Sequence, residues 1–306
     1  MNHYKNILVC LDLTEIDKSL IRYTSFINQA FHAEKITFFH VVQTYDLSND
    51  EMSDYAELGK SIKEAIRNEL DQEFDKKHPK KTKIKLEIKY EEQDASEVIL
   101  DYIRRKDIDI TILGKKPGEE RKGFYSNRII AASQCDILMV PKSVKPEINT
   151  VLSLIDFSKQ SREAFRIAID VARECQAQLI SHYIFSLPRN YFPISYEGDK
   201  EQTEYLKKEG KKKQARFLKN FGKPSIPVSY SFETNTYNNQ IETIEHQLKE
   251  CNANLIVLGA RGKVSSPATL LGNISGELHH LKSDAGIIIV KNKTEKHSFW
   301  NIFLNT

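Results

Sequence analysis

The chain of 306 residues carries a long internal repeat. The first half opens with Asn6–Thr14 and the second with Thr150–Ser158; each segment is an apolar run closed by Asp, a bulky apolar residue and a hydroxyl residue. Further along, Ile110–Gly114 corresponds to Leu255–Gly259, and both pairs of segments keep a spacing of 144 to 145 positions. A repeat of this length predicts two domains of one fold, each large enough for its own core.

Each half alternates apolar runs with segments of helical periodicity. Several runs are continuously apolar, which is typical of parallel strands buried on both faces. The predicted strands are residues 6–12, 35–42, 84–91, 108–114 and 136–141, then 149–156, 177–184, 226–232, 254–259 and 286–291. A longer helix is predicted in each half, at residues 50–77 and 198–220. The alternation predicts an α/β fold of two Rossmann-like domains, each a five-stranded parallel sheet with helices on both faces.

A short polar stretch that contains a proline, from Lys142 to Asn149, is expected to link the domains. We therefore expect one domain at residues 1–143 and a second at residues 148–306. The second domain ends in an aromatic-rich tail, residues 297–306. Such a tail is expected to pack on its own domain or on a partner, with membrane contact as the alternative.

The charge balance argues against some partners. With 45 basic and 42 acidic residues the net charge is +3, too even to indicate nucleic acid or a membrane surface. The basic run Lys207–Lys213 is interpreted as a solvated helix face, with a docking patch as the alternative. There is no secretory signal, no apolar stretch of roughly 18 residues, and no C-x-x-C among the four cysteines. We expect a reduced, cytoplasmic protein that does not enter a membrane.

The second half contains a candidate ligand loop. In open parallel sheets, ligands bind beyond the carboxyl ends of the strands, where the strand order reverses. Asp156 follows the first strand of this half, and Gly259, Gly262 and Gly272 follow the fourth with the spacing G-x2-G-x9-G. Glycines let the backbone turn sharply and approach a ligand closely. Glycines after a strand are also ordinary turn residues, so spacing alone leaves both interpretations open.

The residues around the last glycine have the chemistry of an anion site. Asn273 suits a helix N-cap and Ser275 offers a hydroxyl in the first turn, where backbone amides attract anions. Arg261 and Lys263 add positive charge where a phosphate would lie. Asp156 could accept hydrogen bonds from a base or a sugar.

These features together resemble the universal stress proteins (UspA-like), and the resemblance covers nearly the whole chain twice. It rests on the Asp that ends the first strand, the glycine spacing and a histidine in each second strand, His40 and His182. It implies a strand order of 3-2-1-4-5 in each domain. It also implies that the second domain binds ATP or a related adenine nucleotide, with or without Mg²⁺, although some members of the family bind none. By position it assigns Asp156 to the adenine side, Leu258, Gly259, Arg261 and Gly262 to the ribose and phosphates, and Gly272, Asn273, Ile274 and Ser275 to the phosphates.

Both halves depart from the family pattern. In the second, Asn273 stands where Ser or Thr is usual, which is expected to weaken binding rather than prevent it. In the first, Pro117 replaces the second glycine, the loop is shorter, and Phe124 stands at the position of the phosphate hydroxyl. The first domain is therefore interpreted as a pseudo-site. Its cations Lys115, Lys116, Arg121 and Lys122 are interpreted as a solvated charged loop, with an anion site as the alternative.

No pattern of nucleophile, general base or metal ligands indicates a dedicated enzyme, so at most slow ATP hydrolysis is expected. His40 and His182 are interpreted as packed, hydrogen-bonded core residues at matching places, rather than as metal ligands. The leading hypothesis is a cytoplasmic stress-response protein that binds an adenine nucleotide in its second domain, with homodimers expected. The alternatives are a scaffold or interaction protein without nucleotide, or a binder of another small ligand.

Overall fold

The computed structural model describes residues 3–44, 49–74, 82–115, 124–185, 196–222, 224–234, 240–260, 278 and 281–291. The chain forms two compact units, one built on Met1–Glu147 and the other on Ile148–Asn292. The aromatic tail, whose packing the sequence left open, lies outside the described residues.

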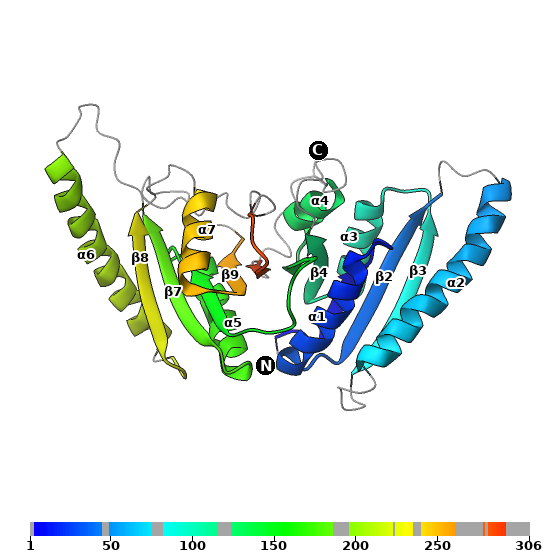
Figure 1. Ribbon diagram of the computed structural model, residues 1–306, viewed down its shortest axis with the longest axis horizontal. Coiled ribbons are helices and arrows are strands. Elements are labelled where there is room, and N and C mark those ends of the chain that lie inside the picture. The colour runs from blue at the N-terminus through cyan, green and yellow to red at the C-terminus, as the bar shows by residue number, and fades with distance from the viewer. Residues whose placement is uncertain are drawn as a thin grey trace, which may run out of the picture. The chain divides into compact units, whose positions relative to one another are not determined.

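The first unit is a five-stranded parallel sheet with the strand order β3-β2-β1-β4-β5. Helices alternate with the strands along the chain, and α1 lies across the sheet (Figure 1). Its elements are β1 (Asn6–Cys10), α1 (Ile16–Phe31), β2 (Lys35–Gln43), α2 (Asn49–Phe74), β3 (Lys83–Glu91), α3 (Ala95–Arg105), β4 (Ile110–Lys115), α4 (Phe124–Ala132) and β5 (Asp136–Pro141).

The second unit repeats this arrangement with the order β8-β7-β6-β9-β10, again entirely parallel. In each unit the described strands therefore follow the order 3-2-1-4-5 when numbered within the unit, which confirms the expected fold. The elements are β6 (Thr150–Leu154), α5 (Lys159–Glu174), β7 (Gln178–Phe185), α6 (Tyr196–Phe221), β8 (Val228–Thr234), α7 (Gln240–Cys251), β9 (Leu255–Gly259) and β10 (Gly286–Val290).

The central strands form the core because both of their faces are covered. Ile7, Leu8 and Val9 of β1 are fully buried, and so are Val151 and Leu152 of β6. Continuous aliphatic runs of this kind suit a parallel strand between two helical layers. The outermost described strands, β3 and β8, are instead half exposed along their length, and β3 carries charged pairs such as Lys85 with Glu87.

Two helices, α3 and α5, start at a short polar residue that caps them. Ser158 is the N-cap of α5, and its hydroxyl accepts a hydrogen bond from the Ser161 amide at 3.1 Å. Asp94 has the same role at α3, where its carboxylate accepts the Ser96 amide at 2.9 Å. Such caps satisfy amides that have no partner inside the helix. Among the described helices, none is both long enough and apolar enough to cross a bilayer.

The backbone shows the repeat in positions that the sequence does not mark. Three pairs of residues with left-handed φ angles recur at matching places: Leu13 and Phe157 (60° and 62°), His32 and Gln176 (both 55°), and Asp107 and Asn252 (46° and 49°). Side chains other than glycine rarely adopt this conformation. The two units therefore share their turns as well as their strands.

The strand register corrects one detail of the internal alignment. Cys10 of β1 lies opposite Phe39, whereas Leu154 of β6 lies opposite His182. The counterpart of His182 is thus Phe39, and His40 corresponds to the residue after His182. Because successive strand residues point to opposite faces, the two histidines lie on different faces of their sheets and are not at matching places.

The left-handed residues Leu13 and Phe157 supply a matched test of this turn. Leu13 is 37 % exposed, so Leu13→Gly removes little packing while it relieves the strained φ, and the free energy of unfolding should change by less than about 1 kcal/mol. Phe157 packs on Tyr183 and Phe217, with ring centroids 4.8 and 5.8 Å away. Phe157→Gly should therefore lower the stability of the second unit by about 2–4 kcal/mol, measured by urea unfolding. Equal losses from the two changes would contradict the aromatic anchoring of Phe157.

Candidate functional site

The chain reverses its direction across the sheet at one point in each unit. In the second unit it moves from β6 to β7 on one side and later returns to β9 on the other, and β6 and β9 are neighbours. Ligands in open α/β sheets bind beyond the carboxyl ends of such a pair of strands. Asp156 follows β6 and Gly259 ends β9, so the structure brings these two predicted site residues to the same point.

Asp156 is held in a defined position at this point. It is 3 % exposed, and its Oδ1 accepts a hydrogen bond from the Ser158 amide at 2.9 Å. This bond closes a turn in which Phe157 takes the left-handed conformation. Burial, and then the nearby Asp156 carboxylate, raise the pKa of Tyr183. The carboxylate is thus buried, oriented and close enough to influence a neighbouring group.

Gly259 is required for packing whether or not a ligand is present. A Cβ at this position would lie 2.9 Å from Cβ of Gln160 and 3.0 Å from its backbone carbonyl carbon. Both atoms belong to the first turn of α5, so the glycine allows that turn to approach β9 closely. Leu258, one residue earlier, is 2 % exposed and belongs to the core. The helix N-terminus therefore lies directly beside the carboxyl end of β9.

The rest of the predicted loop is not located by the structure. Arg261, Gly262, Gly272, Asn273, Ile274 and Ser275 lie outside the described residues, and so does Lys263. Their roles in a ligand site therefore stay predictions.

The corresponding point of the first unit differs in a way that the sequence analysis missed. Asp12 is exposed and forms the same turn, with its Oδ1 accepting the Thr14 amide at 3.1 Å and the Thr14 hydroxyl at 2.6 Å. In addition, the buried Asp17 carboxylate accepts the amides of Asp12 at 3.2 Å and of Leu13 at 2.8 Å. The turn after β1 therefore carries a second, buried carboxylate beside Asp12.

Ser161 takes the place of Asp17 in the second unit. Its hydroxyl donates to the Ser158 carbonyl at 3.1 Å, so it remains within the first turn of α5. A neutral hydroxyl therefore replaces a carboxylate at the same position of the fold. The signal for this difference is visible only once the two halves are aligned residue by residue.

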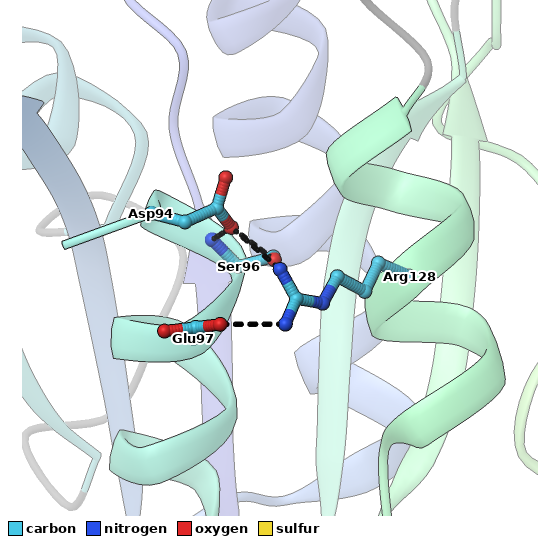
Figure 2. Close-up of polar contacts among 4 residues, drawn as sticks. All are labelled: Asp94, Ser96, Glu97 and Arg128. Carbon is cyan, nitrogen blue, oxygen red and sulfur yellow. Dashed lines mark hydrogen bonds and ion pairs between the residues drawn. The ribbon is translucent and has the colours of Figure 1, made fainter.

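An ion-pair cluster anchors α4 at the carboxyl edge of the first unit. Figure 2 shows Arg128 reaching from α4 to Asp94 and Glu97 at the start of α3. Its guanidinium lies 3.3 Å from Oδ1 of Asp94 and 2.6 Å from Oε1 of Glu97. Asp94 also binds the amide and hydroxyl of Ser96, so the pair fixes the helix cap as well. The cluster therefore fixes α4 against the start of α3.

Lys115 was predicted to lie in a solvated charged loop, and this is wrong. It is the last residue of β4 and is only 4 % exposed, because it still pairs with β5 at Pro141. The other three cations of that loop, Lys116, Arg121 and Lys122, lie outside the described residues.

The prediction of packed core histidines holds in part. His182 is fully buried but neither of its ring nitrogens has a hydrogen-bond partner among the described residues. His40 is partly buried, and its Nδ1 lies 2.9 Å from the Leu11 carbonyl oxygen. Within the described part of the chain, no group of three or more His, Cys, Asp and Glu side chains is placed to hold a metal ion.

Two parallel sheets of order 3-2-1-4-5 with a site at the point of strand reversal define a tandem Rossmann-like protein. A model of the universal stress protein family matches residues 3–141 and again residues 147–281. The chain therefore belongs to the universal stress protein family, with two family domains in tandem. None of the curated protein sequences matches this chain.

Two solved structures with TM-scores above 0.6 share the fold of this chain, and a third structure is similar to part of it. A universal stress protein from Archaeoglobus fulgidus DSM 4304 is 16 % identical with a TM-score of 0.64, covering 95 % of this chain and 98 % of that chain. One described as a putative universal stress protein, from Pseudomonas aeruginosa UCBPP-PA14, is 13 % identical with a TM-score of 0.61, covering 95 % and 94 %. A universal stress protein from Archaeoglobus fulgidus in complex with dAMP is 12 % identical with a TM-score of 0.32, covering 45 % and 98 %.

The two strand-end glycines, Gly259 and Gly114, give a matched test of the site's packing. A Cβ at Gly259 would meet the backbone of α5, which cannot move alone, whereas a Cβ at Gly114 would meet only the Ile16 side chain, with Cδ1 at 2.8 Å. Gly259→Ala should cost about 2–3 kcal/mol of stability and Gly114→Ala about 1 kcal/mol, because the Ile16 tip can rotate away. Thermal unfolding of both variants measures the difference, and a larger loss for Gly114→Ala would refute this account.

Proposed function

We propose that the second unit binds an adenine nucleotide, with ATP as the first candidate, and that the first unit is a pseudo-site. The observation that carries the proposal is the buried, oriented Asp156 at the point of strand reversal beside Gly259. An ionised carboxylate accepts several hydrogen bonds, so Asp156 can receive the Ser158 amide and still accept from an amine or hydroxyl of a ligand. That chemistry suits the base or ribose of a nucleotide.

The loop that follows β9 would hold the phosphates. Its sequence supplies glycines at 262 and 272 for close backbone approach and the cations Arg261 and Lys263 for charge. The helical segment expected near Asn273 would offer amides to a phosphate oxygen. Mg²⁺ could accompany a triphosphate here, since it is usually held by substrate phosphates and only one or two carboxylates.

Charge explains why the first unit is excluded from the proposal. The Asp17 carboxylate accepts the Asp12 and Leu13 amides, so it adds a second negative charge beside the counterpart of Asp156 and disfavours an anionic ligand there. Ser161 in the second unit presents no such charge. This contrast is independent of the Pro117 and Phe124 differences seen in the sequence.

A second function is favoured by one observation. Gly259 is accounted for by its contact with Gln160 alone, so a protein that binds no nucleotide would also need this glycine. The alternative is therefore a scaffold or interaction protein of the same family. We further propose a cytoplasmic homodimer that engages neither nucleic acid nor membranes, in line with its net charge of +3.

The proposal is tested with Asp156→Ala and its matched control, Asp12→Ala. Purified protein should carry an adenine nucleotide or bind added ATP, measured by isothermal titration calorimetry with and without Mg²⁺. Asp156→Ala should weaken binding by at least about tenfold, because it removes a hydrogen bond to a charged acceptor. Asp12→Ala should leave the affinity unchanged. Gly262→Val should abolish binding, since its side chain would block the backbone approach.

Two results would contradict the nucleotide proposal. One is the absence of any binding of ATP, ADP or AMP by folded protein. The other is an equal loss from Asp12→Ala and Asp156→Ala, which would place the site elsewhere. Release of phosphate over hours, measured on the same samples, decides whether the bound nucleotide is hydrolysed.

A further inference from the structure

The second unit buries an imidazole that makes no hydrogen bond to any described residue. His182 of β7 is 0 % exposed, and among the described residues neither Nδ1 nor Nε2 makes a hydrogen bond. Its nearest charged neighbour is Glu233 of β8, whose Oε2 lies 3.7 Å from Nε2. This distance is too long for a hydrogen bond. The oxygen itself is also buried without a hydrogen bond in the described structure.

A second histidine connects this pair to the surface. His246 of α7 places Nδ1 3.4 Å from Oε1 of Glu233, and its side chain is 48 % exposed. Burial raises the pKa of Glu233, and the neighbouring His246 opposes that shift. The His182–Glu233–His246 cluster therefore runs from the core to solvent across β7, β8 and α7.

Few other charged groups face His182. On β6 its register partner is Leu154, and Asp156 lies two residues further along. On α7, Glu250 acts on Glu233 electrostatically. On the opposite face of β7, Tyr183 packs with Phe157 and Phe232 and lies near enough to Asp156 to feel its charge. Glu233 is thus the one described carboxylate within 4 Å of the imidazole.

The first unit has an apolar contact at the same place. Phe39 occupies the position of His182, and its ring centroid lies 4.5 Å from that of Tyr102 on α3. The only histidine of β2, His40, lies on the other face and is anchored at the Leu11 carbonyl. Burial lowers the pKa of His40, but this hydrogen bond and the Asp12 carboxylate oppose the shift.

The direction of the His182 pKa shift determines how the stability of the second unit depends on pH. Burial lowers the pKa of the His182 imidazole from 6.5 to about 4. The unfolded chain therefore binds a proton below about pH 6.5, while the folded unit resists it down to about pH 4. A depressed folded-state pKa means that stability is complete above pH 6.5 and falls as the pH decreases through this window.

We propose that His182, buried just beyond hydrogen-bond distance of Glu233, makes the second unit, and not the first, open in mild acid. The geometry that supports this is a fully buried imidazole without a hydrogen bond among the described residues and a carboxylate 3.7 Å away. The opening would reach the candidate site, because the His182 carbonyl accepts the Ile155 amide at 2.9 Å, one residue before Asp156. The inference does not rest on nucleotide binding.

Hydrogen exchange followed by mass spectrometry tests the proposal on the whole chain. Peptides from β6, β7 and β9 are compared with those from β1, β2 and β4 at pH 7.5 and pH 5.0, after correction for intrinsic exchange rates. The opening equilibrium of the second unit should rise roughly 30-fold more than that of the first, the factor expected for these two pKa values at pH 5.

Two variants separate titration from packing. His182→Phe introduces the residue found at the matching position of the first unit, and His182→Met offers a flexible side chain of similar volume if the ring does not fit. Either folded variant should lose the 30-fold difference between units. His246→Gln should retain it, because His246 is half exposed and is not the buried group.

NMR titration of the His182 ring gives a direct check, with an expected midpoint well below that of an exposed histidine. Three results would overturn the proposal: equal acid response of the two units, an unchanged response in both His182 variants, or a His182 midpoint at or above pH 6.5. The last would mean that Glu233 closes on the protonated ring and stabilises it.

Discussion

Each unit depends on one constraint, the turn that joins its first strand to its first helix. An Asp carboxylate accepts the amide two residues ahead, and the residue between them is forced into the left-handed conformation. This turn sets where α1 and α5 begin, and therefore how closely each helix approaches the fourth strand of its sheet. Gly114 and Gly259 make room for this close approach, because a Cβ at either position would lie within 3 Å of an atom of the helix. The helix start and the location of the candidate site thus follow from the same few residues.

Within this shared framework the two units differ in polarity. Val9, Phe38 and Phe39 of the first unit correspond by register to Ser153, Ser181 and His182 of the second. All three polar residues are buried, and none has a side-chain hydrogen bond among the described residues. A buried polar group without a partner costs about 1–3 kcal/mol. At these three positions the second unit therefore carries a cost that the first does not, although their backbones match turn for turn.

Much of the fold could be predicted from the sequence, since apolar runs such as Ile287–Val290 are hard to place anywhere but a buried parallel strand. The strand order needed the family resemblance, because periodicity does not tell which strands are neighbours. The predictions for His40, His182 and Lys115 were wrong in part because they depend on strand register, which the sequence does not show. His40 and His182 look equivalent in sequence but differ by one position, which reverses the face. Lys115 looks like loop because of its charge, yet it completes the ladder with β5. The role of Asp17 at the amides of Asp12 and Leu13 has no sequence pattern, since it depends on the path of the turn.

The polarity difference and the candidate site lie in the same unit, and this has a thermodynamic consequence. A ligand at about 100 times its dissociation constant stabilises the folded form by about 2.7 kcal/mol. Full protonation linked to a histidine pKa lowered from 6.5 to about 4 destabilises it by about 3 kcal/mol. These energies are similar and opposite, so a nucleotide and protons would compete for one folding equilibrium. The first unit has Phe39 at the position of His182, so we expect it to respond less to acid than the second. If both proposals hold, only the second unit would respond to ligand and to protons, and this asymmetry would come from side chains at matched positions of the same fold.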